Sequence, residues 1–378
     1  MTDVTPFRIA VPDDAIADLH ARLDRTRWPQ LTTDNWSRGQ PVSFVRELAD
    51  HWRHRFDWRR HEAELNAHPQ FRTEIDGQII HFLHIRSTER DAFPLVLTHG
   101  WPSTVAEFLD VIGPLSDPRA HGLDPAIAFD LVIPSLPGYG FSTPLAGPGW
   151  EASRTAAAWD ALMKRLGYTR YGAQGGDGGA LVGRELGILA PEGLVGVHLQ
   201  QIFAFPTGAP GEMDALTPFE QRGMGNYEAF AKNSGYADIQ SKRPGTLAFG
   251  LVDSPAGQMA WNAELFFGFD GRAATFDRDR FLTHASIYWF TGTGGSAAEF
   301  YLENARTGAG YRELPNPTPT GVAVFPDDFV SVRSFAERST AIARWTEMPR
   351  GGHFAASDAP DLLVEDVRAF FGPLIAGR

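Results

Sequence analysis

Short apolar runs alternate with amphipathic stretches along the chain from Pro94 onwards. Continuous apolar runs are typical of strands that are buried on both faces of a parallel sheet. We predict such strands over residues 94–98, 129–134, 194–199, 321–325 and 342–346, with a further strand over 169–174. Apolar residues at helical spacing predict helices over 156–166, 179–189 and 359–374. This alternation predicts an α/β fold with an open, mostly parallel sheet and helices on both of its sides.

Two segments depart from this rhythm. Residues 1–90 carry four tryptophans and short helical patterns such as 13–23, which predicts an N-terminal extension that wraps the rest of the chain. Residues 202–315 are rich in Phe and Gly and lack buried strands. An insertion after a central strand lies over the carboxyl edge of the sheet, so we predict a mainly helical cap there. The predicted units are an extension (1–90), a first core part (91–201), a cap (202–315) and a second core part (316–378).

Composition and charge narrow the range of functions. With 43% hydrophobic and 21% charged residues, the 378-residue chain has the composition of a globular protein, not of a disordered or fibrous one. Its net charge of −12 argues against nucleic acid or an anionic membrane as the main partner. The chain has no cysteine, which excludes disulfides, a thiolate nucleophile and Cys-based zinc sites. We find no signal peptide and no apolar stretch of membrane-spanning length, and we expect a soluble, cytoplasmic protein.

The strongest local motif is Gly175-Gly176-Asp177-Gly178-Gly179, between a predicted strand and a predicted helix. Small residues on both sides of a central side chain permit the tight strand-to-helix turn of a nucleophile elbow. The usual serine is replaced here by Asp177. On its own the motif is equally consistent with a glycine-rich turn capped by an aspartate.

An aspartate at this position indicates a particular chemistry. A carboxylate with a reference pKa near ~3.9 is ionised at pH 7 and needs no base to activate it. It can attack saturated carbon, as in an epoxide or an alkyl halide, to form an ester. Peptides are poor substrates for such a nucleophile.

Hydrolysis of that ester needs a base that is held by an acid, and both follow predicted strands. His353 comes after the strand 342–346, and Asp328 comes after the strand 321–325. The order nucleophile, acid, base (177, 328, 353) is that of the α/β-hydrolase fold. Asp327 competes for the role of the acid, but adjacent side chains diverge and only one of them can face His353.

The segment His99-Gly100-Trp101-Pro102 follows the strand 94–98 and predicts an oxyanion hole. The backbone N–H groups of Trp101 and Gly178 would together hold the oxygen of a tetrahedral intermediate. We also assign His99, Gly100, Pro102 and Phe203 to substrate contacts.

A set of motifs resembles the microsomal-type epoxide hydrolases, which are α/β-hydrolases with an N-terminal extension. These motifs are HGWP (99–102), PGYGFS (137–142), GGDGG (175–179), SGY (234–236), FYLEN (300–304), FPDD (325–328) and RGGHFAA (350–356). The resemblance covers nearly the whole chain. It implies Asp177 as nucleophile, His353 as base and Asp328 as the acid, although the acid of these relatives is commonly Glu. It also implies that Tyr236 and Tyr301 of the cap donate hydrogen bonds and a proton to the epoxide oxygen.

The resemblance also implies that the partners are a small apolar epoxide and water, with no cofactor and no metal. Mammalian members carry a hydrophobic anchor before the extension; this chain starts with the extension, so we expect no membrane anchor. We keep a homodimer open as an assembly. The alternatives are a haloalkane dehalogenase and a non-catalytic ligand-binding relative.

Several weaker patterns are discounted. The serine-elbow-like segment 294–298 lies in the predicted cap, and we expect Ser296 to cap the helix that carries Tyr301. His81 and His84 lie three apart on a predicted strand and face opposite sides, so we do not expect them to chelate a metal. For these two residues and for His51 and His54, we expect solvated or capping roles.

Overall fold

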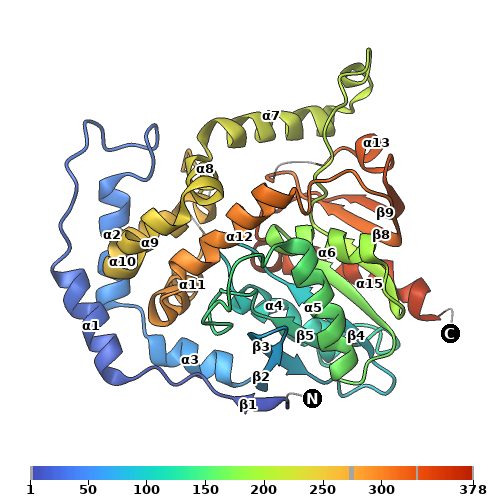
Figure 1. Cartoon of the computed structure of the whole chain (residues 1–378), viewed down its shortest axis with the longest axis horizontal. Coiled ribbons are helices and arrows are strands. Elements are labelled where there is room, and N and C mark those ends of the chain that lie inside the picture. The colour runs from blue at the N-terminus through green and yellow to red at the C-terminus, as the bar shows by residue number, and fades with distance from the viewer. Residues whose placement is uncertain (1–2, 272–275, 329–330, 377–378) are drawn as a thin grey trace.

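The strands predicted from apolar runs form one sheet in the computed structural model, which describes residues 3–271, 276–328 and 331–376. Within these residues nine strands pair in the order β1-β2-β3-β5-β4-β6-β7-β8-β9 (Figure 1). Their bounds are β1 Thr5–Phe7, β2 Gln70–Ile75, β3 Gln78–Ile85, β4 Phe93–Thr98, β5 Phe129–Pro134, β6 Tyr171–Gly175, β7 Leu194–Leu199, β8 Asn316–Val324 and β9 Thr340–Glu347. The six strands from β5 to β9 in this order are parallel to one another, and β1, β2 and β3 pair antiparallel at one edge. The predicted mostly parallel α/β fold is confirmed.

β8 begins five residues before the predicted strand at Gly321. Its first half, with Pro317 and Pro319, has no apolar run that could reveal a strand. The pairing of β8 with β9 is irregular between Asn316 and Thr320, which spans both prolines. Prolines lack an N–H for the ladder, so a strand accepts them only at such irregularities or at unpaired positions.

Helices cover both faces of the sheet. The alternating side chains of β7 show which helices lie on which side: Val197 and Leu199 face Gly183 of α6, whereas His198 faces Asp366 of α15. Helix α5 packs beside α6, and α4 packs beside α15. These helices span α4 Leu109–Ser116, α5 Ala152–Arg165, α6 Gly178–Leu189 and α15 Pro360–Ala376.

A helical segment lies between β7 and β8; in Figure 1 its helices extend from α7 at the top to α9, α10 and α11 at the left and centre. Its helices are η3 Met213–Ala215, α7 Pro218–Asn233, α8 Gly235–Lys242, α9 Pro244–Asp253, α10 Pro255–Phe266, α11 Arg278–Thr291 and α12 Gly294–Thr307. Shorter helices of the core are η1 Val105–Phe108, η2 Pro118–His121, α13 Arg333–Ala336 and α14 Ala355–Asp358. No described residue of this segment belongs to the sheet.

The N-terminal residues contact both the sheet and the helical segment. Helices α1 Asp13–Asp24, α2 Val42–His54 and α3 Trp58–Asn66 pack against α10 and α11, while β1, β2 and β3 extend the sheet. Trp52 of α2 is completely buried, and its indole N–H donates a hydrogen bond of 3.0 Å to Ser286 Oγ of α11. This contact fastens the extension to the helices above the sheet.

We expect Trp52→Ala to lower the free energy of unfolding by ~3–5 kcal/mol, because it empties a large buried volume and leaves Ser286 without its donor. Equilibrium urea unfolding measures the loss. Leu31→Ala removes an exposed side chain of the same extension and should stay within ~0.5 kcal/mol of the wild type. Equal effects of the two substitutions would contradict the anchoring role of Trp52.

A charged cluster lies on the α15 side of the sheet. Asp366 is 2% exposed and accepts hydrogen bonds from Arg344 Nε (2.7 Å) and Thr346 Oγ1 (2.7 Å) of β9, and it contacts His198 Nε2 at 2.9 Å. Burial alone would raise the pKa of Asp366, but the hydrogen bond with His198, together with Arg344 and Thr346, outweighs it and lowers the pKa to about 2. The cluster therefore stabilises the folded protein only while Asp366 is ionised.

Because the pKa of Asp366 is lower in the folded than in the unfolded chain, its stabilisation is present above pH ~4 and lost as the pH falls towards ~2. We expect Asp366→Asn to be less stable than the wild type at pH 7, by ~2–3 kcal/mol, and to lose less stability on acidification. Urea unfolding at a series of pH values measures both effects. Glu365→Gln, at an exposed position of the same helix, is the matched control; an identical acid dependence of Asp366→Asn and this control would contradict the assignment.

Candidate active site

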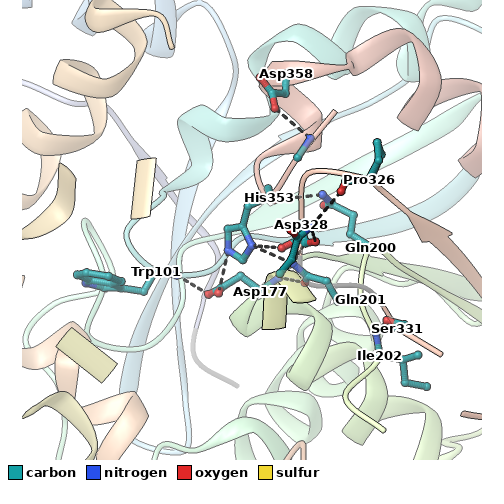
Figure 2. Close-up of polar contacts among 12 residues, drawn as sticks. Trp101, Asp177, Gln200, Gln201, Ile202, Pro326, Asp328, Ser331, His353 and Asp358 are labelled. Atoms are coloured by element: carbon teal, nitrogen blue, oxygen red, sulfur yellow. Dashed lines mark hydrogen bonds and ion pairs between the residues drawn. The ribbon is translucent and has the colours of Figure 1, made fainter. Parts of the chain in front are cut away.

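Four loops at the carboxyl ends of parallel strands converge on one point. Asp177 follows β6, Trp101 follows β4, Asp328 follows β8 and His353 follows β9. Because parallel strands end at the same edge of a sheet, these loops come together although they lie far apart in sequence. Figure 2 shows the side chains of Asp177, Asp328 and His353 pointing toward one another.

Asp177 lies at the tip of a sharp turn between β6 and α6. Its backbone has φ 49° and ψ −124°, a conformation that a residue with a side chain rarely adopts. The turn is tight enough to require glycine on both sides: a Cβ on Gly175 would lie 2.3 Å from Gly179 O, and one on Gly179 would lie 1.9 Å from Thr98 O. The sequence predicted this elbow from the glycines, and the structure has it.

The loop after β4 reaches over the elbow. The Trp101 N–H donates a hydrogen bond of 2.9 Å to Asp177 Oδ1. A Cβ on Gly100 would lie 2.1 Å from Asp177 Oδ1 and 2.5 Å from Gly178 N, so only glycine permits this approach. The backbone nitrogens of both predicted oxyanion-hole residues thus lie close to the carboxylate, and Trp101 already bonds to it.

His353 bridges two carboxylates. Its Nε2 lies 3.1 Å from Asp177 Oδ2, and its Nδ1 lies 2.9 Å from Asp328 Oδ1 (Figure 2). Asp328 is 4% exposed, whereas the neighbouring Asp327 is exposed to solvent. Of the two candidate acids, it is Asp328 that contacts the histidine.

The electrostatics of His353 follow from this geometry. Burial alone would lower the pKa of the imidazole, but the Asp328 and Asp177 carboxylates more than compensate and raise the pKa of His353 well above its usual value. The ring is therefore protonated in the free protein at neutral pH and donates to both carboxylates.

Gln201 is a member of this network that the sequence analysis missed. Its Oε1 accepts a hydrogen bond of 2.7 Å from Asp177 N, and its Nε2 donates to Asp328 Oδ2 and lies 3.0 Å from His353 Nδ1. The side chain is 2% exposed. Its position directly after β7, at the same sheet edge, is a signal that could have revealed it.

Two phenols from the helical segment lie beside Trp101. The Tyr236 ring of α8 stacks on the Trp101 indole with a centroid distance of 4.7 Å, and the Tyr301 ring of α12 lies edge-on to it at 6.0 Å. The two tyrosine rings are 6.1 Å apart. Burial raises the pKa of Tyr236 and of Tyr301 well above the usual value, and the negative charge of Asp177 adds to this effect. Both phenols therefore carry their proton at neutral pH.

A third phenol, Tyr311, was not predicted from the sequence. Its ring lies 5.2 Å from the Phe203 ring, and its side chain is exposed to solvent. Phe203, predicted as a substrate contact, is partly buried and lies beside this tyrosine at the end of the β7 loop.

The remaining predicted residues have mixed outcomes. His99 is fully buried, and both ring nitrogens are used by the backbone: Nδ1 lies 2.9 Å from Gly100 O, and Nε2 accepts from Leu136 N at 3.2 Å. No ring nitrogen is left for a substrate, so His99 shapes the loop instead of contacting the ligand through these atoms. Pro102 is buried in the same loop. Ser296 lies within the first turn of α12 and donates to Gly138 O at 2.6 Å, so the prediction that it caps this helix is wrong.

The histidine pairs lie apart from this site. His81 contacts Ser135 Oγ and Gln70 Oε1, and His84 contacts Tyr168 OH. Both lie in β3 and are buried and hydrogen-bonded, instead of having the solvated or capping roles that we expected. Among the described residues, no group of three or more His, Asp or Glu side chains is arranged to hold a metal ion. In the same described part of the chain, no helix combines the length and the apolar character that crossing a bilayer requires.

Comparison with known proteins gives a consistent result. Residues 4–108 match the family described as "Epoxide hydrolase N terminus". A provisionally named epoxide hydrolase of Stigmatella aurantiaca is 45% identical over 99% of this chain and 86% of its own length. Epoxide hydrolase 1 of Oryctolagus cuniculus is 33% identical over 98% of this chain and 89% of its own length.

The solved structure of juvenile hormone epoxide hydrolase from the silkworm Bombyx mori superimposes with a TM-score of 0.89 at 27% identity, covering 99% of this chain and 95% of that one. The α/β-hydrolase fold expected from the order of Asp177, Asp328 and His353 is thereby confirmed. Sequence and structure together show that the chain belongs to the microsomal-type epoxide hydrolase family.

Proposed function

We propose that this protein hydrolyses an apolar epoxide to a vicinal diol through a covalent ester on Asp177. The observation that carries the proposal is the contact of His353 with both Asp177 and Asp328, next to a Trp101 indole that two protonated phenols contact. A nucleophile, a paired base and acid, and two proton donors are the groups that such a reaction requires.

In the first step Asp177 Oδ2 attacks a ring carbon of the epoxide. The carbon–oxygen bond of the ring breaks, and its electron pair moves to the epoxide oxygen. Tyr236 and Tyr301 donate hydrogen bonds to this oxygen, and one of them transfers its proton. An alkoxide is a poor leaving group in a buried site without such a donor.

In the second step His353 acts as the base. Once Asp177 is an ester it has lost its negative charge, so one of the two carboxylates that raise the pKa of His353 is gone. The imidazole can then give its Nε2 proton to the tyrosinate left by the first step. The same nitrogen next accepts a proton from water, while Asp328 holds the ring through Nδ1.

The hydroxide adds to the ester carbonyl, and the N–H groups of Trp101 and Gly178 stabilise the resulting oxyanion. Collapse of this intermediate releases the alkoxide, which takes the proton from His353. The proton that remains on the Asp177 carboxyl group passes to His353, which restores the protonated imidazole and the carboxylate of the resting protein. The balance is one epoxide plus one water giving one diol.

The surroundings of the phenols favour an apolar substrate. The Tyr236 ring contacts the rings of Trp101, Phe230 and Phe269, with centroid distances of 4.7, 6.4 and 6.5 Å. Aromatic walls with a few polar groups are typical of sites for apolar small molecules. The same phenols favour an epoxide over an alkyl halide, because a departing halide needs no proton.

We expect His353→Gln to accumulate the ester, because alkylation needs no base whereas hydrolysis does. Intact-protein mass spectrometry after incubation with an excess of an apolar epoxide should show an increase equal to one substrate molecule, and diol formation should fall by at least ~10²-fold. The variant Asp177→Ala/His353→Gln should show no adduct. Bromide release from an alkyl bromide without any opening of epoxides would instead identify a dehalogenase.

We expect Tyr236→Phe and Tyr301→Phe each to slow ester formation by ~10–10²-fold, and the double variant by up to ~10⁴-fold, because the oxygen loses its proton donors. Single-turnover kinetics with excess enzyme measure this step. Tyr171→Phe is the matched control. It removes a buried phenol at the start of β6 that donates a hydrogen bond to Asp160. Wild-type rates of ester formation in the double variant would contradict the proposed role of the phenols.

A further inference from the structure

A buried carboxyl group lies behind the loop that carries the predicted oxyanion hole. Glu107 of η1 is 4% exposed, and one of its carboxyl oxygens contacts the hydroxyl of Ser103. The same hydroxyl oxygen lies 3.2 Å from the carbonyl oxygen of Gly100. Ser103 is itself 1% exposed, so neither side chain can turn to bulk water for a partner.

The number of protons restricts how these contacts can form. A carbonyl oxygen can only accept, and the Ser103 hydroxyl has a single proton to donate. If Ser103 donates to Gly100 O, the contact with Glu107 is a hydrogen bond only when Glu107 carries a proton and donates it to Ser103 Oγ. The Gly100 oxygen also lies 2.9 Å from His99 Nδ1, which is the donor nitrogen because Nε2 accepts from Leu136 N.

The Gly100 carbonyl and the Trp101 N–H belong to one peptide group. That N–H donates 2.9 Å to Asp177 Oδ1. Donors at the oxygen of a peptide group polarise it and strengthen the hydrogen bond that its N–H makes. A chain of contacts thus runs from Glu107 through Ser103 and this peptide group to Asp177.

We propose that Glu107, in its neutral form, and Ser103 are positioning residues that polarise the Gly100–Trp101 peptide group and so strengthen the oxyanion-stabilising N–H of Trp101. The proposal rests on the proposed function, in which this N–H acts on the Asp177 ester. The chain matters most in ester hydrolysis, where negative charge develops on the carbonyl oxygen beside Trp101.

The electrostatics of Glu107 agree with a neutral carboxyl group. Burial raises the pKa of Glu107 to about 7; the hydrogen bond with Ser103 and the charge of His353 lower it, and Asp177 raises it. Other titratable groups on the helices packed around η1 are occupied elsewhere. His284 of α11 bonds to Thr104, Asp110 of α4 pairs with Arg280, and Asp358 of α14 accepts from Gly352 N.

The direction of the pH effect follows. Below a pH of about 7 Glu107 donates to Ser103 and the chain is complete. Above that pH Glu107 is ionised and accepts the proton of the Ser103 hydroxyl, so Ser103 no longer donates to Gly100 O. The Glu107 carboxylate also adds a negative charge near the developing oxyanion. Glu107→Gln keeps a donor at every pH, whereas Glu107→Met fills a similar volume without one.

The test compares single-turnover rates of ester formation and ester hydrolysis across pH 5.5–9, from about 1.5 units below to about 2 units above the pKa of Glu107. Ser103→Ala and Glu107→Met should slow hydrolysis by ~3- to 10-fold at pH 6 and leave ester formation less affected. Glu107→Gln should match the wild type at pH 6 and exceed it above pH 7. Dividing the hydrolysis rate of each variant by that of the wild type at the same pH cancels the dependence on His353 as base, because all of these proteins contain His353. Ser116→Ala removes a buried hydroxyl that donates to Ile112 O, and it serves as the control for Ser103→Ala.

A second measurement does not depend on turnover. Infrared spectra of the free protein should show the carbonyl band of a buried protonated carboxyl group that disappears between pH 6 and 8 and is absent from Glu107→Gln. A band that titrates in this way supports the assignment even if no epoxide is hydrolysed. An infrared spectrum identical in the wild type and Glu107→Gln, or unchanged hydrolysis in Ser103→Ala, would overturn the proposal.

Discussion

A buried carboxylate, Asp328, and a partly buried one, Asp177, share one imidazole ring, and much of the structure serves to hold them there. Asp177 and Asp328 approach His353 to 3.1 and 2.9 Å from opposite sides of the ring. Two negative charges this close together in a buried site are tolerable only with a cation between them. In the proposed reaction one of these charges disappears when Asp177 becomes an ester, so the same contact that holds His353 protonated in the resting protein also prepares it to become a base.

The sheet and the helical segment between β7 and β8 each supply a different part of this arrangement. The parallel strands β4, β6, β8 and β9 bring four loops to one edge of the sheet, and the strained turn at Asp177 lifts the carboxylate out of that edge. The helices between β7 and β8 supply Tyr236 and Tyr301, whose rings contact Trp101 of the loop that bonds to Asp177. The N-terminal helices contact α10 and α11 of this layer, and the buried Trp52–Ser286 hydrogen bond is part of that attachment. Thus the phenols keep their position relative to the carboxylate through packing that lies far from the chemistry.

Much of this could be predicted from the sequence, and what escaped prediction has a physical reason. The runs 129–134 and 194–199 coincide with β5 and β7 because central strands buried on both faces must be continuously apolar. The elbow could be predicted because the turn at Asp177 admits only glycine at positions 175 and 179, which leaves a recognisable motif. Gln201 and Glu107, by contrast, belong to no recognisable spacing; their contacts arise only when distant loops meet. His81 and His84 were expected to have solvated or capping roles. A strand pattern does not reveal which polar groups lie beside a side chain in the interior, and here these groups are Ser135, Gln70 and Tyr168.

Several titratable groups around Asp177 share one property: burial shifts their pKa values in the direction that favours the uncharged form. Burial lowers the pKa of His99 to about 4 and raises the pKa values of Tyr139, Tyr236, Tyr288 and Tyr301 well above the usual value. Among the described residues around the site, the charges that remain belong to Asp177, Asp328 and His353 and, above a pH of about 7, to Glu107. Because His353 is largely buried and lies 3.1 Å from Asp177, the loss of the charge at Asp177 changes the potential at the imidazole strongly. The apolar and neutral surroundings are therefore part of the mechanism that we propose, because they make the protonation of His353 depend on the covalent state of its neighbour.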